Sequence, residues 1–140
     1  WGFIDRQEER RRAAELLRVL HFRGIGANVD APVSLLSGGE RQGLAIGRAM
    51  MFDARLVILD EPTTALSLGE VEKVLSFIEQ LRAQGRACLL ITHNMADAYR
   101  VADRFVVMDR GAIVAQYHKA DMTLPALQQA LLDAVRRGSQ

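Results

Sequence analysis

The chain has 140 residues, of which 49% are hydrophobic and 25% are charged, with 18 basic against 17 acidic side chains. This length suits one domain, and the composition is typical of a globular protein. The near balance of charge gives no argument for nucleic acid or an anionic membrane as partner, and no apolar stretch approaches the ~20 residues that cross a bilayer. The single cysteine, Cys88, excludes an internal disulfide framework, and its apolar surroundings predict a reduced core thiol.

Two helices are predicted in the first third of the chain. The first covers residues 5–22, where apolar residues recur at helical spacing and Asp5 with Glu8 has the pattern of a capping box. Two glycines that follow are expected to end it. A second helix is expected to begin after Ser37 and to run to about Phe52.

Strands then alternate with helices. In chain order we expect a strand over 55–60 buried on both faces, a helix from a Ser67–Glu70 capping box to Gly85, and a second buried strand over 87–92. A helix over 95–102 and a strand over 105–108 are expected next. A turn at Arg110 and Gly111 should then lead into a strand over 112–117, which is followed by a helix from about Thr123. The expected buried positions of the two long helices are Leu68, Val71, Val74, Leu75, Ile78 and Leu81, and then Leu124, Leu127, Leu131 and Val135. This alternation predicts an α/β fold with a parallel sheet and a C-terminal β-hairpin.

The segment over residues 36–42, LSGGERQ, is the first with a chemical signal. Ser37 and Glu40 form a capping box, so the simplest interpretation is a capped helix. However, Gly38 and Gly39 lower helix propensity in its first turn. Phosphate binding would offset this cost, because small residues let an anion approach the free N–H groups at the positive end of the helix dipole.

The second signal is a pair of neighbouring carboxylates, Asp60 and Glu61, at the C-terminal edge of the first predicted strand. Neighbouring carboxylates repel, and Mg²⁺ would relieve the repulsion, with Asp60 holding the ion directly or through water. Glu61 would then act as general base toward a water molecule. The alternative is a solvated acidic turn, which is common for one carboxylate and less common for two after an apolar run.

His93 follows the second predicted strand, so we expect it beside Asp60 and Glu61 at the same edge of the sheet. A histidine at a strand end is more often structural or solvated, but next to a phosphate site its imidazole can hydrogen-bond the γ-phosphate. The arginines at positions 10–12 lie on the first helix with Glu8, Glu9 and Glu15 and are interpreted as a solvated, ion-paired face.

These segments resemble, in order, the motifs of the ATP-binding cassette (ABC) ATPases. LSGGERQ resembles the signature motif, LVILDEP over residues 56–62 resembles a Walker B motif with its catalytic glutamate, and His93 stands at the switch-histidine position. Ala65, Leu66 and Ser67 occupy the D-loop position, although many family members have Asp where Ser67 stands. The resemblance covers residues 5–117, and EPTTALS with ITHNM resembles the ATPases of monosaccharide importers.

The resemblance implies part of a P-loop NTPase domain, with a parallel sheet core and helices on both faces. Residues 1–54 would belong to the helical subdomain with the signature, 55–122 to the C-terminal part of the ATPase core, and 123–140 to a C-terminal helix. The pattern GxxxxGK[ST] does not occur, so the Walker A phosphate loop is absent from these residues. We therefore expect the chain to be the C-terminal portion of a cassette and to be inactive by itself.

The resemblance also implies ATP and Mg²⁺ as cofactors and a second ABC ATPase subunit as partner. In that dimer Ser37, Gly38, Gly39 and Glu40 would bind the partner's ATP, whereas Asp60, Glu61 and His93 would serve the chain's own nucleotide. Transmembrane permease subunits would hold the protein at the cytoplasmic face of the inner membrane and convert ATP-driven dimer closure into sugar import, with no nucleic acid involved.

Three alternatives stay open. The chain could be a truncated, non-catalytic module that pairs with an intact subunit, or an ABC ATPase that acts on DNA or the ribosome rather than in transport. The third is an unrelated α/β binding domain that resembles the family by chance.

Overall fold

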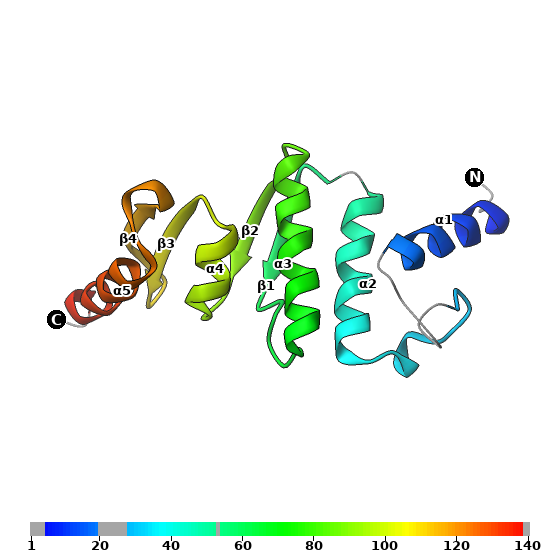
Figure 1. The fold of residues 1–140 in the computed structure, drawn as a ribbon, viewed down its shortest axis with the longest axis horizontal. Helices are drawn as coiled ribbons and strands as arrows, with labels where there is room; N and C mark the ends of the chain where they lie inside the picture. The colour runs from blue at the N-terminus through cyan, green and yellow to red at the C-terminus, as the bar shows by residue number, and fades with distance from the viewer. Residues whose placement is uncertain (1–4, 20–27, 53, 139–140) are drawn as a thin grey trace. The chain divides into compact units, whose positions relative to one another are not determined.

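The computed structural model describes residues 5–19, 28–52 and 54–138 (Figure 1). Its elements are α1 (Arg6–Val19), the 3-10 turn η2 (Val33–Leu35), α2 (Gly38–Met51), β1 (Leu56–Asp60), α3 (Leu68–Ala83), β2 (Ala87–Ile91), α4 (Met95–Val101), β3 (Arg104–Asp109), β4 (Ala112–His118), the 3-10 turn η3 (Lys119–Asp121) and α5 (Leu124–Gly138). Every predicted helix and strand is present, with ends that differ by few residues. The predicted last turn of the first helix and the glycines after it lie outside the described residues. Within the described ranges, no helix has the length and apolar character needed to cross a membrane.

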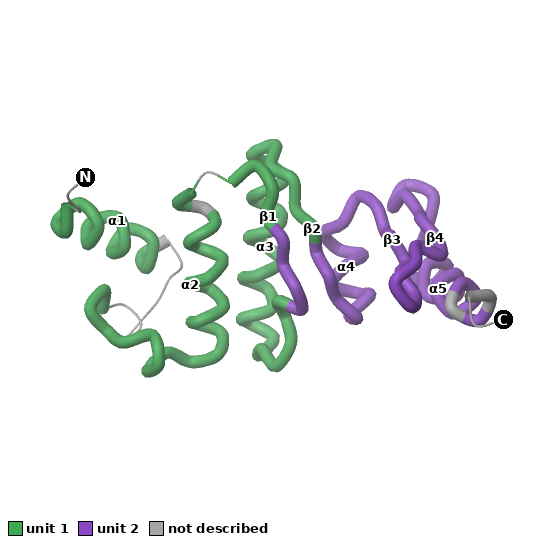
Figure 2. The backbone as a smooth tube through the Cα atoms, turned by 180° about the vertical axis from the view of Figure 1, so that it is seen from behind, with its two compact units in different colours: residues 1–57, 62–89 green, residues 58–61, 90–140 purple. Residues whose placement is uncertain are grey.

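The chain divides into two compact units, which Figure 2 colours separately. The first comprises residues 1–57 and 62–89, and the second comprises residues 58–61 and 90–140. The first unit holds α1, α2 and α3, and the second holds α4, the β3–β4 hairpin and α5. The predicted functional boundaries after residues 54 and 122 stay a prediction, because compactness does not test them.

β1 and β2 pair in a two-stranded sheet. At one end the Ala87 N–H donates to the Arg55 carbonyl over 2.9 Å, and at the other end the Glu61 N–H donates to the Ile91 carbonyl over 2.8 Å. Residue numbers rise together along both strands, so the pair is parallel, as the sequence predicts. Both strands therefore end at the same edge.

Only one face of β1 is covered by the described residues. Val57 and Leu59 are 5% and 7% exposed, whereas Leu56 and Ile58 are 54% and 59% exposed. β2 likewise alternates between exposed and half-buried positions. The prediction of burial on both faces is therefore wrong for the described structure. A continuous apolar run indicates a doubly covered strand, but successive side chains point to opposite faces, and here cover is present on one of them.

The long helices bury most of the predicted positions. On α3, Val74, Leu75, Ile78 and Leu81 are buried as expected, and Phe77 joins them. Leu68 is 87% exposed, so its predicted burial is wrong, because it lies at the first residue of the helix, ahead of the turns that pack. On α5, Leu127 is buried, Leu124 and Leu131 are half-buried, and the side chain of Val135 lies outside the described residues.

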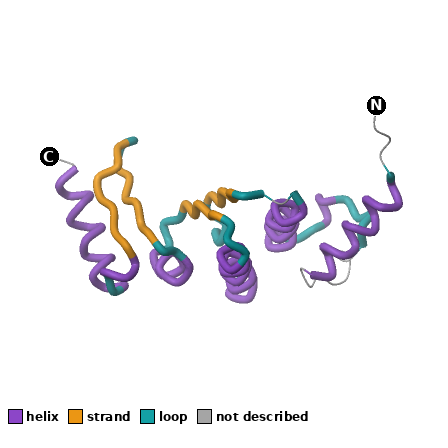
Figure 3. Tube along the Cα trace, turned by 90° about the horizontal axis from the view of Figure 1, so that it is seen from above, coloured by secondary structure: helices purple, strands orange, loops and turns teal. Residues whose placement is uncertain are grey.

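The second unit is built on the predicted hairpin, along which α5 lies (Figure 3). β3 pairs antiparallel with β4 from Arg104 opposite His118 to Asp109 opposite Ala112. The turn between them places Arg110 at φ 47° and Gly111 at φ 81°. Two consecutive positive φ angles match the twist of the strands, as in type I′ hairpin turns.

Replacement of Gly111 by Ala should lower the free energy of unfolding by about 1 kcal/mol, because a Cβ in the left-handed region meets the following carbonyl oxygen. Urea unfolding followed by circular dichroism measures the change. Gly69→Ala is the matched control, since Gly69 lies in α3 with open space around it and should lose no stability. Equal effects of the two substitutions would contradict this account of the turn.

Candidate functional site

Glu61 and His93 meet where the two parallel strands end. Glu61 follows β1, and its carboxylate Oε1 accepts a hydrogen bond from the His93 backbone N–H over 3.1 Å. The His93 ring Nδ1 lies 2.9 Å from each of the two carboxylate oxygens. The predicted placement of His93 beside Glu61 is therefore confirmed.

Both side chains can be reached by a ligand, since that of His93 is 79% exposed and that of Glu61 is 38% exposed. Glu61 has φ 46°, in the left-handed region that residues other than glycine seldom adopt. The backbone bond to Ile91 and the contacts to His93 hold it there. Strained residues of this kind occur often at functional sites.

Asp60, predicted to hold a metal ion, is the exposed last residue of β1 and precedes Glu61. No group of three or more His, Cys, Asp and Glu side chains able to hold a metal ion occurs among the residues described. Mg²⁺ is often bound by one or two carboxylates together with substrate phosphates and water. Asp60 suits such a site as a single protein ligand, and this role stays a prediction.

The predicted capping box at the start of α2 is confirmed. The Ser37 N–H donates to Glu40 Oε2 over 2.8 Å, and Ser37 Oγ accepts from the Glu40 N–H over 3.2 Å. Gly38 and Gly39 are the first two residues of the helix. Ser37 is exposed, so this helix start is accessible from solvent.

Gly39 has a neighbour that sequence reasoning missed. A Cβ built on Gly39 would overlap the carboxylate of Glu70 and lie 2.7 Å from its Cγ, whereas a Cβ on Gly38 would meet nothing within 4 Å. Glu70 belongs to the next helix, α3, so no local pattern could have indicated the contact.

The D-loop positions form a turn that enters α3. The Leu66 N–H donates to the Thr63 carbonyl over 3.4 Å, and Ala65 has φ 59°. Ser67 caps α3 as predicted: its N–H and its hydroxyl donate to Glu70 Oε2 over 2.9 Å and 2.8 Å. The same carboxylate thus touches Gly39 and holds Ser67.

A further cap follows His93. Asn94 Oδ1 accepts hydrogen bonds from the N–H groups of Ala96 and Asp97 over 3.1 Å and 3.2 Å. Asn94 thereby begins α4 and fixes the backbone that follows His93. Asparagine is a favoured N-cap residue, so its place before the predicted helix was an available signal.

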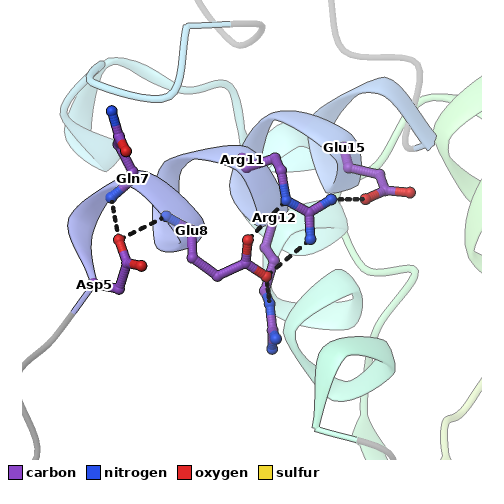
Figure 4. Close-up of polar contacts among 6 residues, drawn as sticks. All are labelled: Asp5, Gln7, Glu8, Arg11, Arg12 and Glu15. Carbon is purple, nitrogen blue, oxygen red and sulfur yellow. Dashed lines mark hydrogen bonds and ion pairs between the residues drawn. The ribbon is translucent and has the colours of Figure 1, made fainter.

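Glu8 pairs with Arg11 and Arg12 along α1, and Glu15 pairs with Arg11, as Figure 4 shows. Arg10 pairs instead with Asp30, outside the helix. The Glu8 carboxylate accepts from Arg11 Nε and Arg12 Nε over 2.7 Å each, and Arg11 lies 3.5 Å from Glu15. The hydrogen bonds from Arg11 and then Arg12 lower the pKa of Glu8 to about 2. Asp5 caps the helix, accepting from the Glu8 N–H over 3.1 Å. The predicted solvated, ion-paired face is confirmed.

Cys88 is a free, half-buried thiol on β2. Burial raises its pKa and so lowers the fraction of reactive thiolate. This favours the predicted packing role.

The chain is similar in sequence to known proteins over most of its length. The sequence pattern of the family described as "ABC transporter" matches residues 4–64. The chain is 36% identical over 129 residues to the xylose/arabinose import ATP-binding protein XylG of Sulfolobus acidocaldarius, covering 92% of the chain and 51% of that relative. It is 39% identical over 134 residues to the ribose import ATP-binding protein RbsA of Roseobacter denitrificans, covering 94% of the chain and 25% of the relative.

The fold is similar to that of a solved cassette. The dimeric structure of a post-hydrolysis state of the ATP-binding cassette MJ0796 bound to ADP and Pi aligns with a TM-score of 0.71 at 28% identity. The alignment covers 84% of this chain and 50% of that one. The chain thus spans about half the length of this cassette and of the XylG of Sulfolobus acidocaldarius.

Glu70 should titrate below the ordinary glutamate range, because hydrogen bonds from the Ser67 N–H and then the Ser67 hydroxyl lower its pKa. A lowered folded-state pKa means that the cap stabilises the fold above the unfolded pKa of about 4.5 and is lost as pH falls through the folded value. NMR titration of the Glu70 carboxyl carbon measures this. Ser67→Ala should raise the pKa and Ser76→Ala should leave it unchanged; an unchanged value in Ser67→Ala would contradict the assignment.

Proposed function

Since the chain belongs to the ABC transporter ATPase family, we propose that it forms the C-terminal part of a cassette that binds and hydrolyses ATP to drive a membrane transporter. The observation that carries this proposal is the contact of Glu61 with His93 at the shared end of two parallel strands. Ligands of open α/β sheets bind at this end.

In this proposal each side chain at the strand ends has one task. Glu61 is the general base that takes a proton from the water attacking the γ-phosphate. His93 orients the Glu61 carboxylate, to which it is already hydrogen-bonded, and steadies the γ-phosphate. Asp60 is a ligand of Mg²⁺, which supplies positive charge to the phosphates when ATP is bound.

The start of α2 serves the nucleotide of a second subunit. Ser37 Oγ accepts from the Glu40 N–H, which leaves its O–H free to donate to a phosphate. The N–H groups of Gly38 and Gly39 and the helix dipole add to this anion site, with Glu40 holding Ser37 in place. Ala65, Leu66 and Ser67 would lie at the contact between subunits, and the dimeric state of the related cassette supports this arrangement.

The transported substrate is proposed to be a sugar. The relative XylG is named as a xylose/arabinose import protein, and the relative RbsA is named as a ribose import protein. Transmembrane permease subunits would then receive the motion of the cassette, and the chain would lie peripherally at the cytoplasmic face of the membrane. We expect these permeases, and no nucleic acid, to copurify with the intact gene product.

The isolated 140 residues should show no ATP hydrolysis above background, because they contain no GxxxxGK[ST] loop to hold the β- and γ-phosphates. Phosphate release at millimolar MgATP is the measurement. The control is the chain carrying Glu61→Gln, which should give the same background. Turnover that this substitution removes would contradict the prediction.

In the intact gene product, Glu61→Gln should lower kcat by about 10²-fold or more, since it removes the proposed general base while leaving nucleotide binding in place. The variant should therefore accumulate as an ATP-bound dimer in size-exclusion chromatography with light scattering. Glu79→Gln is the control, because Glu79 is an exposed residue of α3, and this variant should hydrolyse ATP at the normal rate. Normal turnover in Glu61→Gln would remove Glu61 from this role.

A further inference from the structure

One carboxylate on α3 reaches two segments that are separate in sequence. Glu70 Oε2 accepts from the N–H and the hydroxyl of Ser67, at the end of the D-loop turn. Its other oxygen, Oε1, lies in the space that a side chain at position 39 would need. All three residues belong to the same compact unit.

The two glycines at the start of α2 differ in this respect. Gly38 has open space where its Cβ would be, whereas a Cβ at Gly39 would collide with Glu70. A side chain at position 39 would therefore have to displace the Glu70 side chain, independently of any ligand. This carboxylate is the flexible end of its side chain, and its present position is the one in which it accepts hydrogen bonds from Ser67.

We propose that Glu70 is a positioning residue that couples the start of α2 to the D-loop turn within one subunit. This rests on the proposed function, in which residues 37–40 and residues 65–67 both act at the subunit contact. A shift of Gly39 presses on the Glu70 carboxylate and loosens the Ser67 cap. Movement of the D-loop turn carries the carboxylate with it and changes the space beside Gly39.

The coupling predicts non-additive effects of substitution. Gly39→Ala would drive the Glu70 carboxylate off Ser67, which Glu70→Ala also achieves by removing the carboxylate. Once Glu70 is absent, the methyl group at position 39 has room, so the part of the Gly39→Ala defect that passes through Glu70 disappears. Gly38→Ala has no such neighbour, which makes it the matched control.

The test is a double-substitution cycle in the intact gene product. The variants are Gly39→Ala, Gly38→Ala, Glu70→Ala and each glycine variant combined with Glu70→Ala. For each variant, kcat and KM for MgATP and the Tm are measured. We expect the kcat loss caused by Gly39→Ala to shrink by at least about threefold in the Glu70→Ala background, and the loss caused by Gly38→Ala to be the same in both backgrounds within about twofold. Glu70→Gln, whose amide oxygen can still accept from Ser67, should keep kcat closer to wild type than Glu70→Ala does.

An equal Gly39→Ala loss in both backgrounds would overturn the proposal. If Gly39→Ala does not fold, recovery of a cooperative melt on adding Glu70→Ala supports the coupling, and failure to fold in both backgrounds overturns it. If the wild-type protein does not hydrolyse ATP, the proposed function fails, and the additivity of the Tm changes decides on Glu70 separately.

Discussion

The parallel pairing of β1 with β2 is the constraint on which the proposed chemistry depends. Because both strands end at one edge, the residues that follow them, Glu61 and His93, come within hydrogen-bonding distance although they are distant in sequence. The pairing continues past β1 into the Glu61 N–H, which donates to Ile91 and so fixes the backbone of the proposed base. At this anchored position Glu61 has φ 46°, and its carboxylate accepts a hydrogen bond from the His93 backbone N–H.

The helices α2 and α3 each begin with a capping box of the same type, but the two boxes have different neighbours. Glu40 closes the box at Ser37, which is exposed. Glu70 closes the corresponding box at Ser67 and also fills the space beside Gly39. The Glu70 carboxylate thus contacts both the D-loop turn at Ser67 and the first turn of α2.

Most of the fold and the Glu61–His93 contact could be predicted from local patterns. The capping boxes, the β-branched strand and the Arg110–Gly111 turn each specify a backbone geometry over a few residues, and the order of strands and helices specifies a parallel pair. The exposure of Ile58 could not be predicted, because it depends on which other elements cover that face of the strand. The contact of Gly39 with Glu70 could not be predicted from the sequence either, since it joins two helices whose relative placement is set by the core.

The central claim is that one ATP lies between the strand ends of one subunit and the α2 start of another. Its most direct test is an experimental structure of the intact gene product carrying Glu61→Gln with MgATP. The account predicts a dimer in which each γ-phosphate lies within hydrogen-bonding distance of His93 in one protomer and of Ser37 in its partner. A nucleotide bound within one protomer, with Ser37 of both protomers facing solvent, would contradict it.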